Sequence, residues 1–219
     1  MAYTKKMAGY NPICIKGRAI AKSWWGQAWC NNLELYADYV NRIARGKAYV
    51  RNGSVIHLAI EGGTVTAKVQ GSKARPYNVS VNISPMSVPD WDRIKCLCQN
   101  KIGSLTELAE GKFPAEFAVL FTQKNSRLFP SPKEIKFSCS CPDWACMCKH
   151  VAAVLYGIGA RFDDDPMLFF TLRGIDVNDL IKRSINDKVN TMLASAGKRT
   201  ERTLENIDIC ALFGDDIVL

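Results

Sequence analysis

The sequence predicts an α+β protein in which an antiparallel sheet packs on helices, followed by a small ββα-like unit and a helical C-terminal region. Three observations lead to this prediction. Apolar residues recur at helical spacing over residues 24–42, and they alternate with polar residues between residues 47 and 84. Four cysteines and one of the two histidines of the chain then fall within residues 139–150.

The first predicted helix covers residues 24–42 and follows Ser23, which is a typical N-cap residue. Its three tryptophans, Trp24, Trp25 and Trp29, are interpreted as anchors in the core, with a ligand platform as the alternative.

The next segment changes to the period of two that is typical of strands. Asn52-Gly53 and Gly62-Gly63 are two-residue hairpin turns, because they supply the positive φ angles that such turns need. They predict an antiparallel meander with strands over residues 47–51, 54–61, 64–71 and 76–84. One face packs on the tryptophan helix. The other face is polar, and we expect it to carry His57, Thr64, Thr66, Lys68, Gln70, Asn78, Ser80 and Asn82.

Short helices complete the prediction around the cysteine-rich unit. Pro89-Asp90-Trp91 opens a helix that runs to about Gln99, and the spacing of Ser104 and Glu107 predicts a capped helix to about Glu110. Asp176 is expected to cap a further helix. Residues 204–219 mix acidic and large apolar residues, so they could dock on the core of the same chain or bind a partner.

Composition excludes several classes of protein. The chain has 219 residues, 47% of them hydrophobic, which is ordinary for a globular protein. Its longest nearly apolar run, Val151 to Ala160, is shorter than the roughly 20 residues of a membrane-spanning helix. The N-terminal region lacks the apolar core of a secretory signal. Nine cysteines without a signal peptide therefore predict free thiols in a reducing compartment, the cytoplasm.

The charge is unevenly distributed. The net charge is +8, but residues 1–75 hold 12 Lys/Arg against 3 Asp/Glu, whereas residues 138–219 hold 9 against 12. Such asymmetry is one indication of nucleic-acid binding by the basic half, and a basic but merely soluble surface is the alternative.

The cysteine cluster has the spacing of a metal site. Cys139 and Cys141 share one face of a predicted strand, and Pro142 ends that strand. Cys148 in a turn and His150 in the first turn of the following helix can converge on them, which gives a closed Cys₃His set of the kind that holds structural zinc. Spacing alone also allows Cys146 as the third thiolate. A catalytic Cys/His pair and a redox-active CxC pair are further alternatives.

At these residues the sequence resembles the SWIM zinc finger, in which a CxC pair on a strand hairpin is followed, after a spacer, by CxH before a helix. Cys139-Ser-Cys141 and Cys148-Lys-His150 match this pattern. Lys22-Ser-Trp-Trp-Gly, Tyr49-Val-Arg-Asn-Gly-Ser and Phe129-Pro-Ser-Pro make the whole chain similar to bacterial SWIM-finger proteins. The resemblance favours Cys148 over Cys146. It implies zinc binding, and DNA or protein binding in association with helicases and with recombination or chromatin-like machinery, without a particular catalytic activity.

These observations together predict a non-enzymatic zinc protein that binds nucleic acid, with DNA as the expected ligand, as part of a larger assembly. The expected organisation is a basic α+β domain over residues 1–120, the SWIM finger over 121–162, and an acidic helical region over 163–219. The expected phosphate contacts cluster in sequence, and they are Arg42, Arg45, Lys47, Arg51, Lys68, Lys73 and Arg75. The alternative is a protein-interaction adaptor for a helicase or recombination partner. No membrane association is expected.

Overall fold

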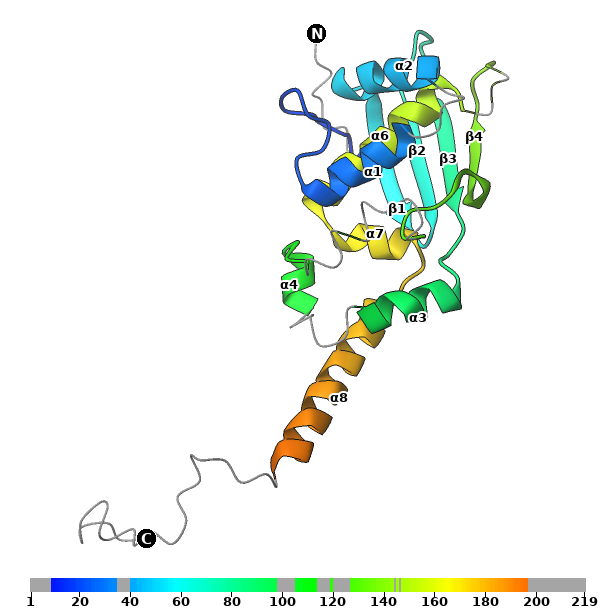
Figure 1. Ribbon diagram of the computed structural model, residues 1–219. Helices are drawn as coiled ribbons and strands as arrows, with labels where there is room; N and C mark the ends of the chain where they lie inside the picture. Colours follow the sequence, from blue (N-terminus) through cyan, green and yellow to red (C-terminus); the bar gives the residue numbers. More distant parts are fainter. Residues whose placement is uncertain are drawn as a thin grey trace, which may run out of the picture.

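The computed structural model of the chain describes residues 9–34, 40–97, 105–113, 119, 127–143, 145 and 147–196 (Figure 1). Its helices and strands, in chain order, are α1 (Trp24–Glu34), α2 (Val40–Arg51), β1 (Val55–Glu61), β2 (Thr64–Val69), β3 (Tyr77–Ile83), α3 (Val88–Leu97), α4 (Leu105–Ala109), β4 (Ile135–Cys139), α6 (Lys149–Asp164), α7 (Met167–Leu172) and α8 (Val177–Ala196). A 3₁₀ turn at Pro132–Glu134 precedes β4. None of the helices in these ranges combines the length and the apolar character that a membrane crossing requires.

The predicted α+β class is confirmed. The four strands form one antiparallel sheet in the order β1-β2-β3-β4, so β4 of the predicted finger is a strand of the main sheet. The domain boundaries at residues 120 and 162 stay a prediction, and both the β3–β4 pairing and the packing of α7 on α6 cross them.

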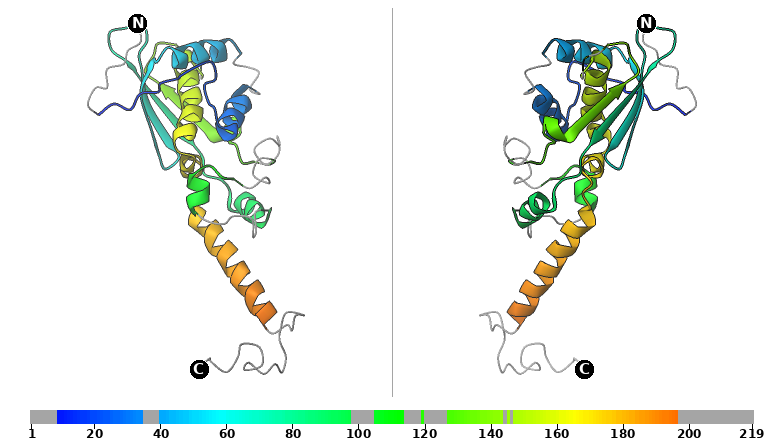
Figure 2. Two further views of the ribbon diagram at one scale, coloured as in Figure 1. Left: turned by 90° about the vertical axis from the view of Figure 1, so that its left-hand side faces the viewer. Right: turned by 90° about the vertical axis from the view of Figure 1, so that its right-hand side faces the viewer.

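Helix α6 is the centre of the core. It contacts all four strands, and α1 and α2 pack against its other side (Figure 2). The expectation that the sheet packs on the tryptophan helix is therefore wrong: α6 lies between them. The burial pattern of α6 explains this position, because His150 to Gly159 are all buried and only a helix that is covered all round has such a sequence.

Small residues allow the helices to approach α6 closely. A Cβ atom on Gly46 of α2 would lie 2.5 Å from Cβ of Ala152, and one on Gly26 of α1 would lie 2.7 Å from the carbonyl oxygen of Gly159. Hydrogen bonds then fix α1 in place. The indole of Trp29 donates to the Leu155 carbonyl at 2.8 Å, and that of Trp25 donates to the Phe162 carbonyl at 2.9 Å.

Asp163, near the end of α6, caps the start of α1. Its carboxylate accepts the backbone N–H groups of Lys22 and Ser23, and also the Ser23 hydroxyl. The segment Lys22-Ser-Trp-Trp-Gly thus docks α1 on α6. Trp25 and Trp29 are anchors as predicted, whereas Trp24 is 36% exposed.

The predicted strand over residues 47–51 is wrong, as is the continuous helix over 24–42. Two helices, α1 and α2, occupy this region, and residues 35–39 lie outside the described part of the chain. Ile43, Gly46 and Val50 recur at helical spacing on the buried side of α2, which packs on α6. Asn52-Gly53 ends this helix instead of turning a hairpin: Gly53 has φ +69°, and the N–H of Ser54 donates to the Tyr49 carbonyl at 3.0 Å.

The other three strands of the predicted meander are confirmed to within one or two residues, and Gly62-Gly63 connects β1 to β2 with φ angles of +48° and +84°. Cross-strand pairs place the expected polar residues on one face: Thr64 opposite Asn82, Thr66 opposite Ser80, and Lys68 opposite Asn78. The expected helices near residues 90 and 105 are confirmed as α3 and α4. Asp176 caps α8 as predicted, because its carboxylate accepts the Asn178 N–H at 2.9 Å.

Candidate metal centre

Strand β4 delivers two thiols to the same side of the sheet. Cys139 is its last residue, opposite Val79 of β3. The pairing continues one residue further, since the Ser140 N–H donates to the Asn78 carbonyl and the Asn78 N–H donates to the Ser140 hydroxyl, both at 3.0 Å. Cys139 and Cys141 therefore keep the two-residue period of the strand and point in the same direction, as predicted.

The start of α6 delivers the other two groups. Cys148 is its N-cap, with extended backbone angles (φ −78°, ψ 170°), and its carbonyl accepts the Ala152 N–H at 3.0 Å. His150 follows in the first turn of the helix. Both side chains are almost completely buried. Because the cysteine lies outside the helix and the histidine inside it, their side chains can face the same point. Two side chains at positions i and i+2 of one helix would point in nearly opposite directions.

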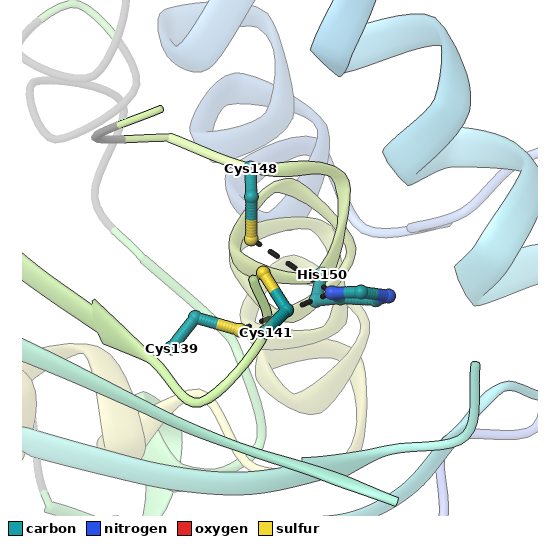
Figure 3. Close-up of side chains that lie close together, drawn as sticks. All are labelled: Cys139, Cys141, Cys148 and His150. Atoms are coloured by element: carbon teal, nitrogen blue, oxygen red, sulfur yellow. Dashed lines mark hydrogen bonds between the residues drawn. The ribbon is translucent and has the colours of Figure 1, made fainter. Parts of the chain in front are cut away.

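These four residues form one cluster, the Cys₃His cluster, whose members are Cys139, Cys141, Cys148 and His150 (Figure 3). Their potential ligand atoms all lie within 4.8 Å of one another. Both Cys139 Sγ and Cys148 Sγ lie 3.9 Å from His150 Nδ1. A tetrahedral zinc site with Zn–S and Zn–N distances of about 2.3 and 2.0–2.1 Å would have ligand–ligand separations of about 3.5–3.8 Å. The cluster therefore has the size and the donor set to hold a metal ion.

Asp143 lies in the segment that connects the two halves of the cluster. The Asp143 carboxylate accepts the Ala145 N–H at 3.2 Å, so Asp143 stabilises the turn as predicted. The alternative ligand Cys146, and Trp144, lie outside the described residues.

Aromatic rings from two other elements enclose the imidazole of His150. Tyr77, the first residue of β3, stacks on it with ring centroids 4.5 Å apart, and Tyr49 of α2 meets it edge-on at 5.4 Å. Gly71 leaves room for this arrangement, since a Cβ there would lie 2.6 Å from Tyr77 and 3.3 Å from His150 Nε2. Nδ1 is the ring nitrogen that faces the thiols. Nε2 is buried, without a hydrogen-bond partner in the described part of the chain.

A hydrogen bond between the thiols of Cys139 and Cys148 shifts their pKa values in opposite directions. The hydrogen bond with the Cys139 thiol lowers the pKa of Cys148 to about 3, although burial opposes this shift, and His150 and the Val151 N–H add to the lowering. The same hydrogen bond, followed by burial, raises the pKa of Cys139 above its ordinary value. The Cys139 thiol, the imidazole and the Val151 N–H at the helix N-terminus therefore all favour a thiolate at Cys148.

The cluster would be a closed site. Three thiolates and one imidazole fill a tetrahedral coordination sphere, so no position would remain for an activated water molecule. The donors also come from two different layers of the fold, because β4 belongs to the sheet and α6 to the helical layer. A bound ion would therefore cross-link the two layers of the core.

The residues predicted to contact phosphate have different surroundings. Arg42 forms an ion pair with Asp143 of the turn, Lys47 pairs with Glu34 at 2.6 Å, and Arg51 donates to the Arg18 carbonyl at 3.2 Å. Lys68 lies on the polar face of the sheet, 3.3 Å from the Tyr10 hydroxyl.

The remaining three, Arg45, Lys73 and Arg75, are exposed. Arg45 belongs to α2, and Lys73 and Arg75 belong to the β2–β3 connection beside His150. Tyr49, Gly71 and Tyr77 were not predicted as neighbours of the cluster. No local pattern marks them, because they lie beside His150 only through the tertiary fold.

Comparison with known proteins identifies a relative of this chain. The chain is 36% identical over 164 residues to the uncharacterized protein Rv2102 of Mycobacterium tuberculosis (strain ATCC 25618 / H37Rv). The matched region is 74% of this chain and 59% of that protein, so the chain spans about three fifths of its relative. No protein-family model matches the sequence, and no solved structure matches it.

Proposed function

We propose that this chain is a non-enzymatic protein that binds nucleic acid, with DNA as its ligand, and that its Cys₃His cluster holds one structural Zn²⁺. The observation that carries the proposal is the convergence of four ligand atoms within 4.8 Å at the start of α6, beside a basic surface. The cluster keeps the SWIM-type spacing of CxC and CxH, with Cys148 as the third thiolate.

Zinc is the metal that suits this donor set. Three soft thiolates and an imidazole in a tetrahedral arrangement favour Zn²⁺ over the hard cations Mg²⁺ and Ca²⁺, which prefer oxygen ligands. The thiolates must stay reduced to bind it, so we place the protein in the cytoplasm. The six described cysteines are all free thiols, which fits this placement.

Zinc would have an organising role for the basic surface. It would fasten the turn that carries Asp143, and Asp143 in turn holds Arg42 at the start of α2. Tyr49, near the other end of α2, contacts His150, and Lys149 lies over the Tyr49 ring at 5.8 Å. The metal would thus fix α2 at both of its ends.

We name three exposed bases, Arg45 of α2 together with Lys73 and Arg75 of the β2–β3 connection, the basic end. No ion pair is seen at these three residues within the described part of the chain, so their charges are available to phosphates. Such contacts would supply affinity that depends on salt and is independent of base sequence. Arg42 and Lys47 are less suited to this role, because each is already paired with a carboxylate.

The test is a salt titration of DNA binding by the whole chain. The triple variant R45E/K73E/R75E should bind a DNA duplex more weakly, and its log–log salt dependence should be less steep by roughly 0.9 for each phosphate that the variant no longer neutralises. The matched control is K133E/K136E/K182E, which has the same charge change at exposed lysines away from this end of the sheet. Absence of DNA binding by the wild-type chain at about 50 mM salt, or equal losses of affinity in both variants, would contradict the proposal.

A second candidate function is that of a protein-interaction adaptor, for a helicase or recombination partner. The observation that favours it is α8, which extends away from the sheet in Figure 1. Val189, Met192 and Leu193 lie near its end and are 46%, 69% and 67% exposed. The variant V189S/M192S/L193S should lose a co-purifying protein partner while it retains DNA binding. Residues 204–219, the other expected docking segment, lie outside the described residues.

A further inference from the structure

The outer face of the sheet, opposite α6, contains a hollow of about 460 Å³. All four strands contribute to it, and Cys139 of the Cys₃His cluster forms part of its lining. We call it the sheet-face hollow, and its polar lining consists of His57, Thr66, Lys68, Asn78, Ser80, Ser138 and Ser140.

The polar side chains of the lining can all donate hydrogen bonds, and Ala67, Val79 and Cys139 complete it; among the described residues the lining includes no carboxylate. Lys68 contributes an ammonium group, which is held 5.1 Å from the centre of the Tyr10 ring. The imidazole of His57 accepts the Asn11 N–H through Nδ1 at 3.1 Å, so its Nε2 carries the proton and is a donor. The Ser140 hydroxyl accepts the Asn78 N–H and keeps its own proton free to donate.

The position of the hollow connects it to the basic end. Lys68 lies just before the end of β2 and Asn78 just after the start of β3. The connection between these two strands carries Lys73 and Arg75. A polyanion bound at the basic end could therefore continue directly onto the outer face of the sheet.

We propose that the sheet-face hollow binds phosphate groups of a single-stranded nucleic acid. This inference rests on the proposed function. It adds that the nucleic acid is single-stranded and that the protein contacts it in a second region besides the basic end. Hydroxyl, amide and ammonium donors without a competing carboxylate are the groups that proteins direct at backbone phosphates. A single strand can follow an open groove one nucleotide at a time, which a rigid duplex cannot do.

The lining also argues against a protein partner at this position. Protein interfaces depend on buried aromatic and arginine anchors. In the part of the chain that the structure describes, His57 is the only aromatic ring that lines the hollow, and no arginine does so. This composition further predicts weak discrimination between bases, since base stacking would contribute little here.

The experiment compares two variants of the same sheet face. Lys68 lies in the hollow, and Lys136 is exposed on the same face but outside it. With a fluorescent 15-nucleotide oligo(dT) at about 50 mM salt, K68Q should lose about fivefold in affinity, and its salt dependence should be less steep by roughly 0.7. K136Q should bind as the wild-type chain does.

K68Q also removes the contact between Lys68 and Tyr10, so it could change the local structure as well as the charge. A second pair of variants therefore tests the hollow without this contact. S138D places a carboxylate in the hollow and should weaken binding, whereas N82D places one on the same face outside it and should not. Zinc content and circular dichroism should be unchanged in all four.

The outcomes separate this inference from the proposed function. If K68Q and S138D bind oligo(dT) normally while R45E/K73E/R75E does not, the sheet-face hollow is excluded and nucleic-acid binding stands. If K136Q loses as much affinity as K68Q, the loss follows from the lower net charge of the protein and not from the position of the lysine. The sheet-face hollow is then likewise excluded as the binding site. If the wild-type chain binds neither single-stranded nor duplex DNA, both proposals fall.

Discussion

The ring of Tyr77 stacks on the ring of His150, with centroids 4.5 Å apart and an angle of 29° between the ring planes. Tyr77 begins β3 and His150 lies in the first turn of α6, so one side-chain contact joins the sheet to the candidate metal centre. Nδ1 of the stacked imidazole faces the thiols of Cys139 and Cys148. We therefore expect metal binding to depend on Tyr77, a residue outside the predicted ligand set.

The first prediction concerns this stacking. Y77A should release zinc more readily than the wild-type chain, because removal of an aromatic pair weakens the orientation of His150 by about 0.5–1.5 kcal/mol. Y77F keeps the ring and is the matched control, with wild-type retention expected. The measurement is the rate of zinc transfer to a colorimetric chelator. Equal rates in Y77A and Y77F would show that the stacked ring does not orient the ligand.

The second prediction concerns the ligands themselves. The purified chain should contain about one zinc per molecule. Substitution of Cys139, Cys141, Cys148 or His150 by alanine should abolish zinc binding and expose the finger region to proteolysis, because the ion would cross-link β4 and α6.

Two cysteine variants serve as controls for the ligand set. Cys14→Ser changes an exposed thiol and should retain zinc. Cys146→Ser should also be mild. Zinc loss in Cys146→Ser together with retention in Cys148→Ser would reverse the assignment of the third thiolate. A folded chain without metal would refute the zinc site altogether.

The third prediction tests the packing of α2 on α6. G46A should destabilise the protein by about 1–3 kcal/mol, because its methyl group would overlap Ala152 and neither helix backbone can move freely. The control is A48S on the exposed side of the same helix. Urea unfolding measures both. If G46A is as stable as the wild-type chain, the two helices do not pack as closely as described.

The fourth prediction is a pH dependence set by Glu134. Burial alone would raise the pKa of this carboxyl, but hydrogen bonds from Ser131 and the neighbouring Arg173 outweigh it, and the pKa lies below its ordinary value. Arg173 is only 1% exposed and donates to the Glu134 carboxylate at 3.1 Å.

Because folding lowers the pKa of Glu134, the folded state is favoured while the carboxylate is ionised. This contribution is fully present above the pKa of the unfolded chain and is lost as the pH falls through the folded value, from about pH 5 downward. E134Q should be less stable at neutral pH and should lose less stability on acidification. E61Q, at an exposed glutamate, should follow the wild-type profile. Parallel profiles for E134Q and the wild-type chain from pH 7 to about pH 3 would contradict the assignment.

The members of the Cys₃His cluster were predictable because their signal is local. Cys139 and Cys141 keep the period of a strand, and Cys148 and His150 flank the start of a helix, so residues within a single stretch of chain define the cluster. The hairpin at Gly62-Gly63 and strands β2 and β3 were predictable for the same reason, since two adjacent glycines and alternating residues act over a few positions.

The register of strand β1 could not be predicted from its own sequence. Simple alternation places Ile56 in the core with Leu58. In the sheet, Val55 pairs with Val69 and His57 pairs with Lys68, so Ile56 is an extra residue and Val55 becomes completely buried. A bulge of this kind depends on the partner strand, and the sequence of β1 alone contains no sign of it.

The sequence by itself determined the α+β class, the polar outer face of the sheet and the composition of the Cys₃His cluster, because periodicity and ligand spacing are local properties. Only the tertiary structure decided that residues 47–51 are helical: Gly46 and Val50 pack against α6, and this packing outweighs the strand-like alternation of a short segment. It also decided which bases are exposed, since Glu34 and Asp143 reach Lys47 and Arg42 from segments that are distant in the chain. Long-range packing and ion pairs of this kind have no counterpart in the pattern of neighbouring residues.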